Sequence, residues 1–95
     1  MAAVVGILQF TILIRGAHSL KEKRRVVRSI KDHFGHHFNI SIAEVEDQDM
    51  LNRAVFCIAM AGSDSKYVDA ALRKILDQLR VHRGAELLDH TLELL

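Results

Sequence analysis

Proline is absent from this 95-residue chain, and glycine occurs only five times. A chain without proline and without a Ser/Gly-rich tract has no segment with the composition of a disordered linker. The length is that of one domain and leaves no room for a second core. We therefore predict a single compact domain over residues 1–95.

Cysteine is nearly absent as well. The single thiol, Cys57, excludes an intramolecular disulfide and a cysteine-based zinc site, and this usage fits a reducing compartment. The apolar start of the chain, Met1 to Ile14, lacks the basic flank and small-residue cleavage pattern of a signal peptide. It is also too short to cross a bilayer. We expect a cytoplasmic protein without a membrane partner.

Aromatic residues and net charge are both low, at 5% of the chain and a formal +1. A sheet that recognises RNA by stacking needs exposed aromatic rings on its inner strands. The RNP pattern is absent, and Phe10 and Phe56 have the parity that we assign to the buried face. Base stacking on the sheet is therefore disfavoured, and only a local concentration of charge would indicate nucleic-acid binding.

The chain does contain a regular succession of apolar patterns. Strands are predicted at Val4–Ile14, Asn39–Glu46, Arg53–Ala61 and Leu88–Leu94, with helices after Ser19 and after Asp64. The first and third strands are apolar on both parities, whereas the second and fourth alternate. In a split βαβ sheet of order 4-1-3-2, the first and third strands are the inner pair. We predict an α+β, ferredoxin-like βαββαβ fold: an antiparallel four-stranded sheet with both helices on one face.

Local signals define the ends of these elements. Ser19 to Glu22 forms a capping box for the first helix, which Gly35 is predicted to end. Asp64 is predicted to cap the second helix, which closes near Gly84. Gly6, inside the first strand, indicates a bulge or a close backbone approach.

Positive charge is concentrated on the first helix. At about 100° per residue, five cations form one stripe beside the apolar face: Lys21, Arg24, Arg25, Arg28 and Lys31. Lys23 lies nearer the apolar face and is expected to extend its ammonium out to solvent. A cation in the first turn of a helix costs about 0.3–1 kcal/mol. Together with Ser19, these groups predict a surface that binds phosphate or RNA; the alternative is a solvated helix face.

The sheet face away from the helices is predicted to be unusually apolar. Besides Thr11 and Ala61, it holds six candidate interface residues: Val5, Ile7, Leu13, Val55, Cys57 and Ala59. Large exposed apolar patches usually mark contacts, so we expect a homodimer through this face or through a strand edge. The alternative is an ordinary exposed sheet of small side chains.

The remaining polar clusters give no catalytic or metal signature. His33, His36 and His37 are interrupted by Gly35, which is predicted to break the helix between them. The acidic stretch from Glu44 to Asp49 is expected to pair with Arg53 or with a neighbour's basic helix, to hold a cation weakly, or to be solvated. No nucleophile–base order or phosphate-binding glycine loop occurs. We predict no enzyme activity, no metal and no cofactor, and the sequence identifies no small-molecule ligand.

Several strings resemble one family. They are S-L-K-E-K-R-R-V from Ser19, F-N-I-S-I-A-E-V from Phe38, Q-D from Gln48 and the closing L-L-D-H-T-L-E-L-L. This pattern is similar to the YlxP-like family over nearly the whole chain, and L-K-E-K-R is its most specific part. The resemblance implies a ferredoxin-like fold in small bacterial proteins, often encoded beside translation and ribosome-maturation factors. It implies no activity, cofactor or catalytic residue.

Two functions follow as hypotheses. The first is a non-enzymatic accessory protein that binds structured RNA, or a ribonucleoprotein such as a ribosomal particle, through the basic first helix. The alternative is a homo-oligomeric interaction module, or a ligand-sensing module, built on the apolar open sheet face.

Overall fold

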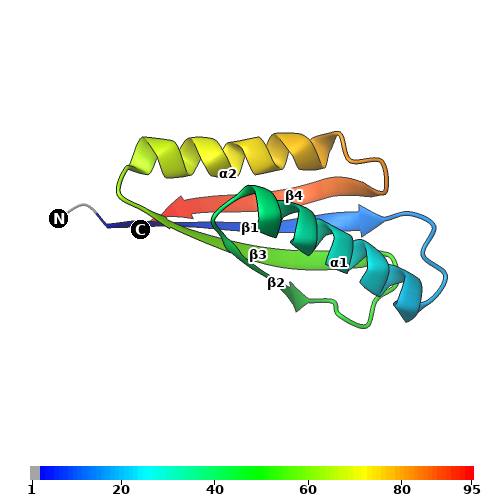
Figure 1. The fold of residues 1–95 in the computed structure, drawn as a ribbon. Coiled ribbons are helices and arrows are strands. Elements are labelled where there is room, and N and C mark those ends of the chain that lie inside the picture. The colour runs from blue at the N-terminus through cyan, green and yellow to red at the C-terminus, as the bar shows by residue number, and fades with distance from the viewer. Residues whose placement is uncertain (1–2) are drawn as a thin grey trace.

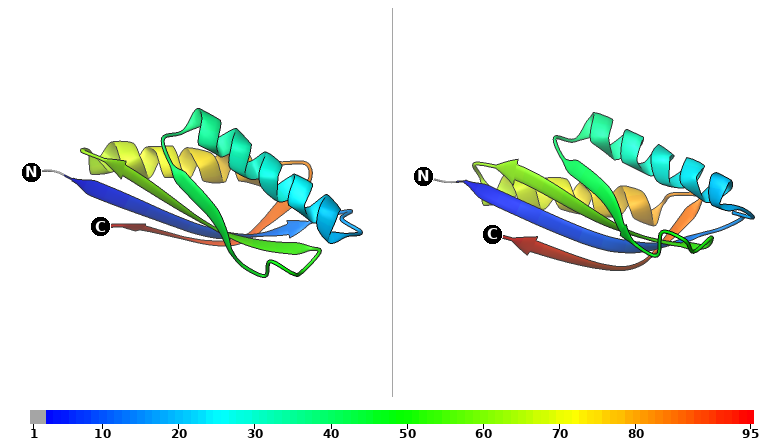
Figure 2. Two further views of the ribbon diagram at one scale, coloured as in Figure 1. Left: turned by 60° about the horizontal axis from the view of Figure 1, so that its bottom comes forward. Right: turned by 90° about the horizontal axis from the view of Figure 1, so that it is seen from below.

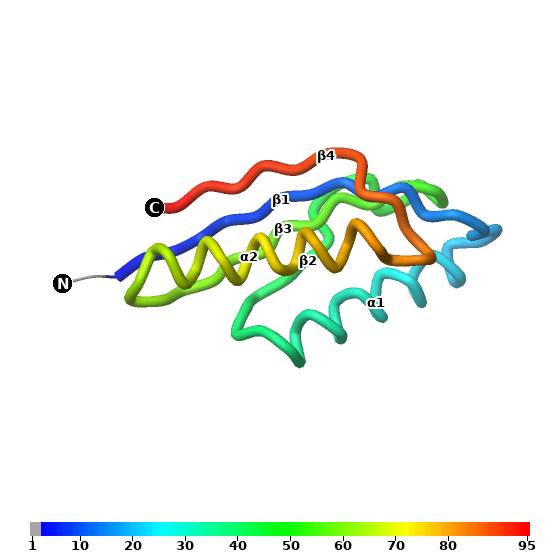
Figure 3. The backbone as a smooth tube through the Cα atoms, turned by 90° about the horizontal axis from the view of Figure 1, so that it is seen from above, coloured from blue at the N-terminus to red at the C-terminus, as the bar shows by residue number. Residues whose placement is uncertain are grey.

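The computed structural model describes residues 3–95, so Met1 and Ala2 of the predicted domain lie outside the described residues. Six elements follow in the order β1 (Val4–Ile14), α1 (Leu20–His37), β2 (Ser41–Glu46), β3 (Arg53–Gly62), α2 (Ser65–Arg80) and β4 (Ala85–Leu94). The strands form one sheet with both helices on the same side of it (Figures 1 and 2). The two helices run in opposite directions (Figure 3).

The sheet has the order β2-β3-β1-β4, and every pairing is antiparallel. Read from the other edge, this is the predicted order 4-1-3-2, so the α+β, ferredoxin-like prediction is confirmed. The two strands that are apolar on both parities, β1 and β3, are the inner strands. Neither helix in residues 3–95 combines the length and the hydropathy that a membrane crossing requires.

Several element boundaries differ from the sequence prediction. Strand β2 begins at Ser41 rather than at Asn39, β3 ends at Gly62 rather than at Ala61, and α2 ends at Arg80, before Gly84. Helix α1 does not end at Gly35 but continues to His37, and the extended residue Phe38 caps it by donating its N–H to the Phe34 carbonyl. Strand β4 begins at Ala85 rather than at Leu88, because the β1–β4 register shifts between Thr11 and Ile12. This bulge breaks the alternation that marks the strand in the sequence.

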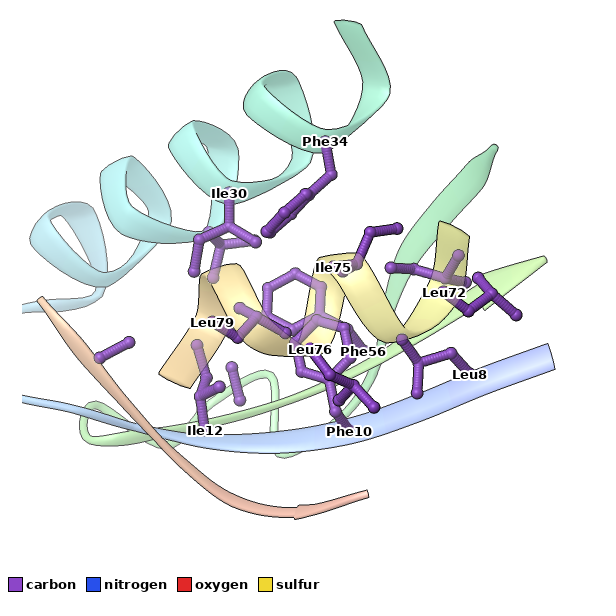
Figure 4. Packing of buried hydrophobic residues seen from close by; sticks show 14 of the residues in the cluster. Leu8, Phe10, Ile12, Ile30, Phe34, Phe56, Leu72, Ile75, Leu76 and Leu79 are labelled. Atoms are coloured by element: carbon purple, nitrogen blue, oxygen red, sulfur yellow. The ribbon is translucent and has the colours of Figure 1, made fainter. Parts of the chain in front are cut away.

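The core lies between the helices and one sheet face. Its sheet side includes Ala54, Ala85 and seven larger residues, each of the seven at most 4% exposed: Leu8, Phe10, Ile12, Ile14, Phe56, Ile58 and Met60. The rings of Phe10 and Phe56 stack with their centroids 5.2 Å apart. Ile30 and Phe34 point from α1 toward side chains of α2 (Figure 4). Because both inner-strand rings are buried, they are not available for stacking on bases.

Helix α2 packs close to β1 at Gly6. A β-carbon placed there would lie 2.6 Å from Leu72 Cδ1 and 2.6 Å from Val68 Cγ1. The prediction at Gly6 is a bulge or a close backbone approach; the structure instead has a close approach of α2 side chains, with no register shift at Gly6. Gly35 is different, since nothing lies within 4 Å of a β-carbon built on it.

One charged side chain is buried in residues 3–95, and it belongs to the basic helix. Lys23 is 1% exposed. Its Nζ lies 3.0 Å from Glu44 Oε2 of β2 and donates to the Asp47 carbonyl at 2.6 Å. Oε2 accepts no hydrogen bond from the described residues, so its contact with Lys23 is an ion pair. The prediction that Lys23 extends to solvent is wrong, because Glu44 faces the helix layer and neutralises the ammonium there.

The turn between β2 and β3 is arranged around Asp47. This residue has φ 59°, a left-handed conformation that Asp tolerates better than most residues. Its carboxylate pairs with Arg53 Nε at 3.1 Å, which is one of the pairings expected for the acidic stretch. The Asp47 backbone and side chain thus hold one cation each, Lys23 and Arg53.

The glycine contacts predict opposite effects for the same substitution. Gly6→Ala should destabilise the protein by about 1–3 kcal/mol, because the stiff Val68 side chain must shift. Gly35→Ala, the matched control inside α1, should stabilise it by roughly 0.8–1 kcal/mol through helix propensity. Urea unfolding followed by circular dichroism measures both. A Gly6→Ala variant as stable as the wild type would contradict the close packing of α2 on β1.

The buried ion pair predicts an asymmetric response. Glu44→Leu should lower the free energy of unfolding by about 3 kcal/mol, because it leaves the Lys23 ammonium buried without its carboxylate. Adding Lys23→Met should restore most of that stability, since both charges are then gone. Asp77→Ala, which breaks the exposed pair with Arg80, is the control and should change stability by less than about 1 kcal/mol. Equal losses for Glu44→Leu and Asp77→Ala would mean that Lys23 reaches water.

Candidate nucleic-acid interface on α1

The start of α1 is satisfied by the protein's own groups. Ser19 is the N-cap, and its Oγ accepts the Glu22 amide at 3.2 Å. The Glu22 carboxylate accepts the His18 amide at 2.8 Å. The capping box is confirmed, with its glutamate bonded to the amide before the cap. Ser19 and the helix start are therefore a poor place for a bound phosphate, because a carboxylate already lies beside them.

The five cations of the predicted stripe remain available. Lys21, Arg24, Arg25, Arg28 and Lys31 are all exposed. No carboxylate of residues 3–95 lies within ion-pair distance of any of them. We call these five residues the α1 stripe. Lys23 does not belong to it, because its ammonium is buried and paired.

The α1 stripe runs along the helix rather than around one point. Lys21 and Lys31 are ten residues apart, which is about 15 Å of helix at roughly 1.5 Å per residue. Two surface hollows of about 400 Å³ each lie among these side chains. Arg24 and Arg28 line both hollows. Asp32 also lines the hollow next to Lys31, whereas the hollow next to Lys21 is lined by cations alone. The stripe therefore offers an extended row of cations instead of a single focused pocket.

Charge is strongly segregated in the chain. Helix α1 holds six of the 13 Lys and Arg residues but two of the 12 Asp and Glu residues. Its formal charge is thus +4, while the rest of the chain carries −3. The net charge of +1 conceals this separation, which creates a local positive potential over α1.

The predicted interface residues lie on the open sheet face, but they are not equally accessible. Val5 is 38% exposed, and Ile7, Leu13, Cys57 and Ala59 are half-buried. Val55 is 4% exposed and offers almost no surface to a partner. The prediction that Val55 is an interface residue is therefore corrected. Val55 lies between Thr11 and Glu46 in the sheet, which explains its burial.

The histidine cluster has a different geometry from the predicted one. Because α1 continues through Gly35, His33 and His37 lie one turn apart with ring centroids 4.5 Å from each other. His33 Nε2 lies 3.2 Å from Gln78 Oε1 and so joins α1 to α2. No group of three or more potential ligands gathers at a metal-binding distance within the described residues.

A cavity that nothing in the sequence indicates lies between the C-terminal end of α1 and the first half of α2. Its volume is about 350 Å³. Polar groups of His37, Asn39, Tyr67 and Lys74 line it. These residues come from two segments that are distant in sequence, 37–39 and α2, so no local motif indicates the cavity.

Comparison with known proteins identifies a family. Residues 5–92 match the family described as "Protein of unknown function (DUF503)". Over 73 residues, the chain is 34% identical to "Uncharacterized protein YlxP" of Bacillus subtilis (strain 168), which covers 77% of this chain and 79% of that protein.

Two solved structures match this chain at low sequence identity. An amidase of the hydantoinase/carbamoylase family from Burkholderia phymatum is 12% identical with a TM-score of 0.50, covering 98% of this chain and 28% of that one. A mutant of SnoaB, a cofactor-independent oxygenase from Streptomyces nogalater, is 17% identical with a TM-score of 0.47, covering 100% and 92%. The match over residues 5–92 and the identity to YlxP show that the chain belongs to the DUF503 family, the YlxP-like family that its first-helix motif resembles.

Proposed function

We propose that this protein is a non-enzymatic accessory factor that binds structured RNA, or a ribonucleoprotein such as a ribosomal particle, through the α1 stripe. One observation carries the proposal. All five stripe cations lack a carboxylate partner in residues 3–95, whereas five of the eight other Lys and Arg residues have one. Of the eight Lys and Arg residues in residues 3–95 without a carboxylate partner, five lie on one side of α1 and the other three are Lys66, Lys74 and Arg83.

The shape of the stripe favours a polyanion over a single small anion. The stripe is about 15 Å long and has two adjacent hollows, which suits several phosphates in a row. The helix start, where a single phosphate would normally bind, is already occupied by the Glu22 carboxylate. Binding along the outer face of α1 needs no change in the capping box.

Recognition of this kind would rest on the shape and charge of the RNA. The inner-strand rings that would stack on bases are Phe10 and Phe56, and both are buried under the helices. Lys and Arg contacts to phosphate position a nucleic acid without reading its sequence. Structured RNA, in which phosphates are dense and regularly spaced, fits this mode better than an unstructured single strand. The resemblance to a family often encoded beside ribosome-maturation factors makes ribosomal particles the first ligand to test.

Charge reversal of Arg24, Arg25 and Arg28 to Glu should abolish co-sedimentation with ribosomal particles at low salt, because it removes the cations that line both hollows. The matched control reverses Lys66, Arg73 and Arg83, which are also exposed and give the same change in net charge. The control should still co-sediment. Equal behaviour of the two triple variants would reject the α1 stripe as the binding surface.

Salt dependence gives a second readout of the same prediction. If all five stripe cations contact phosphate, the slope of log K against log salt concentration should be about −3.5 to −4.5. The α1 triple variant should lose most of that slope, and circular dichroism should show that it remains folded. A wild-type affinity that does not change with salt would contradict a phosphate-binding surface.

A second candidate function is homo-oligomeric interaction through the open sheet face. The observation that favours it is a hollow of about 390 Å³ on this face, lined by Val5, Ala59 and Ala61 beside residues 39–41. An exposed valine next to an apolar hollow is the type of surface that a partner covers. Unlike RNA binding, this function does not involve α1.

Light scattering at high protein concentration distinguishes this candidate. A protein that associates through the open face should have twice the mass of one chain, and Ala59→Glu should return it to a single chain by placing a charge in the contact. Val81→Glu, on the exposed loop after α2, is the control and should not alter the mass. A strict monomer for the wild type would remove this function.

A further inference from the structure

The cavity between α1 and α2 combines an apolar base with a polar rim. Its apolar contributors include Met60 of β3 and Ala71 of α2. Met60 is 4% exposed and belongs to the core, so this side of the cavity is rigid. At about 350 Å³, the volume lies within the range of small-molecule sites, near its lower end.

The rim of the cavity contains hydrogen-bond donors and a cation but no acid. His37, Asn39, Tyr67 and Lys74 line it, and no Asp or Glu does. The Lys74 ammonium and the Tyr67 hydroxyl have no hydrogen-bond or ion-pair partner among residues 3–95. An unpaired ammonium in an acid-free hollow favours a ligand that brings its own negative charge.

Two of the rim side chains are suited to particular parts of a ligand. The His37 Nδ1 lies 2.7 Å from the His33 carbonyl, to which it donates, so the ring is held in place with Nε2 free. Tyr67 is the chain's only tyrosine, and it is 65% exposed although its ring is large and largely apolar. A planar group lying against that ring would cover apolar surface that is otherwise in water.

We propose that this cavity is a binding site for a small molecule that joins a planar aromatic or heteroaromatic group to one anionic group. The planar group would lie between Tyr67 and the apolar side formed by Met60 and Ala71, and the anion would meet Lys74. An aryl carboxylate and a nucleoside monophosphate share this chemistry. The site lies on the helix side of the sheet and uses no residue of the α1 stripe, so it is independent of RNA binding. It shares Asn39 with the hollow on the open sheet face.

Nuclear magnetic resonance titration of the full chain tests the site with four probes. These are 2-naphthoate and adenosine monophosphate, with their neutral counterparts 2-naphthamide and adenosine. At least one anionic probe should shift the backbone amides of Asn39, Ala70 and Ala71 in a saturable manner, and its neutral counterpart should bind about tenfold more weakly. Tighter binding of 2-naphthoate would identify an aryl carboxylate as the ligand class, and tighter binding of adenosine monophosphate would identify a nucleoside monophosphate.

Three variants complete the test. Lys74→Gln should weaken the anionic probe about tenfold, the effect of losing one charge-assisted hydrogen bond, and should leave the neutral probe unchanged. Lys66→Gln is the matched charge control on α2 and should leave both unchanged. Ala70→Phe, at an exposed position of the lining, should block all binding without unfolding the protein. The proposal is overturned by shifts that map elsewhere, by equal effects of the two lysine variants, or by no saturable shift from either anion.

Discussion

The contact between Lys23 and Glu44 determines how the first helix presents its charge. An ammonium that is 1% exposed needs a carboxylate beside it, and the only described one in contact is on β2. Together with the apolar contacts of Ile30 and Phe34, this pair fixes the rotation of α1 about its own axis. With Lys23 directed inward, the other cations of the helix must project outward. A helix whose charges would otherwise be spread around its surface thus has one defined basic side.

The same contact separates two kinds of lysine and arginine in this protein. Lys23, Arg53, Arg73 and Arg80 have carboxylates nearby and contribute to the stability of the fold or its surface. The α1 stripe has none and contributes positive potential instead. Ten of the 12 acids lie outside α1, in β2, α2, β4 and the loops. Segregation of this kind increases the local field without changing the net charge of the chain.

Much of the fold could be predicted from local patterns, because the strand alternation, the helical repeat of apolar residues and the helix caps are all encoded by neighbouring residues. These local patterns predict the bounds of β1, the inner position of β3 and the caps at Ser19 and Asp64. They also predict the burial of Phe10 and Phe56. The partner of Lys23 could not be predicted, since a helical pattern places it near the apolar face but does not identify an acid 21 positions away. The bulge beside Leu88 and the acid-free cavity at Tyr67 were missed for the same reason. Each depends on register or packing between segments that are distant in sequence.

The absence of a side chain at Gly6 also selects the alignment of the sheet. Because β1 is apolar on both parities, its sequence alone would tolerate sliding against its neighbours by one or two places. Only a residue without a β-carbon fits beneath Val68 and Leu72, and β1 has only one such residue. A slip by two would place Val4 or Leu8 there and force α2 off the sheet. The missing β-carbon of Gly6 thus gives β1 a unique register against its neighbours, which its hydrophobic pattern leaves undetermined.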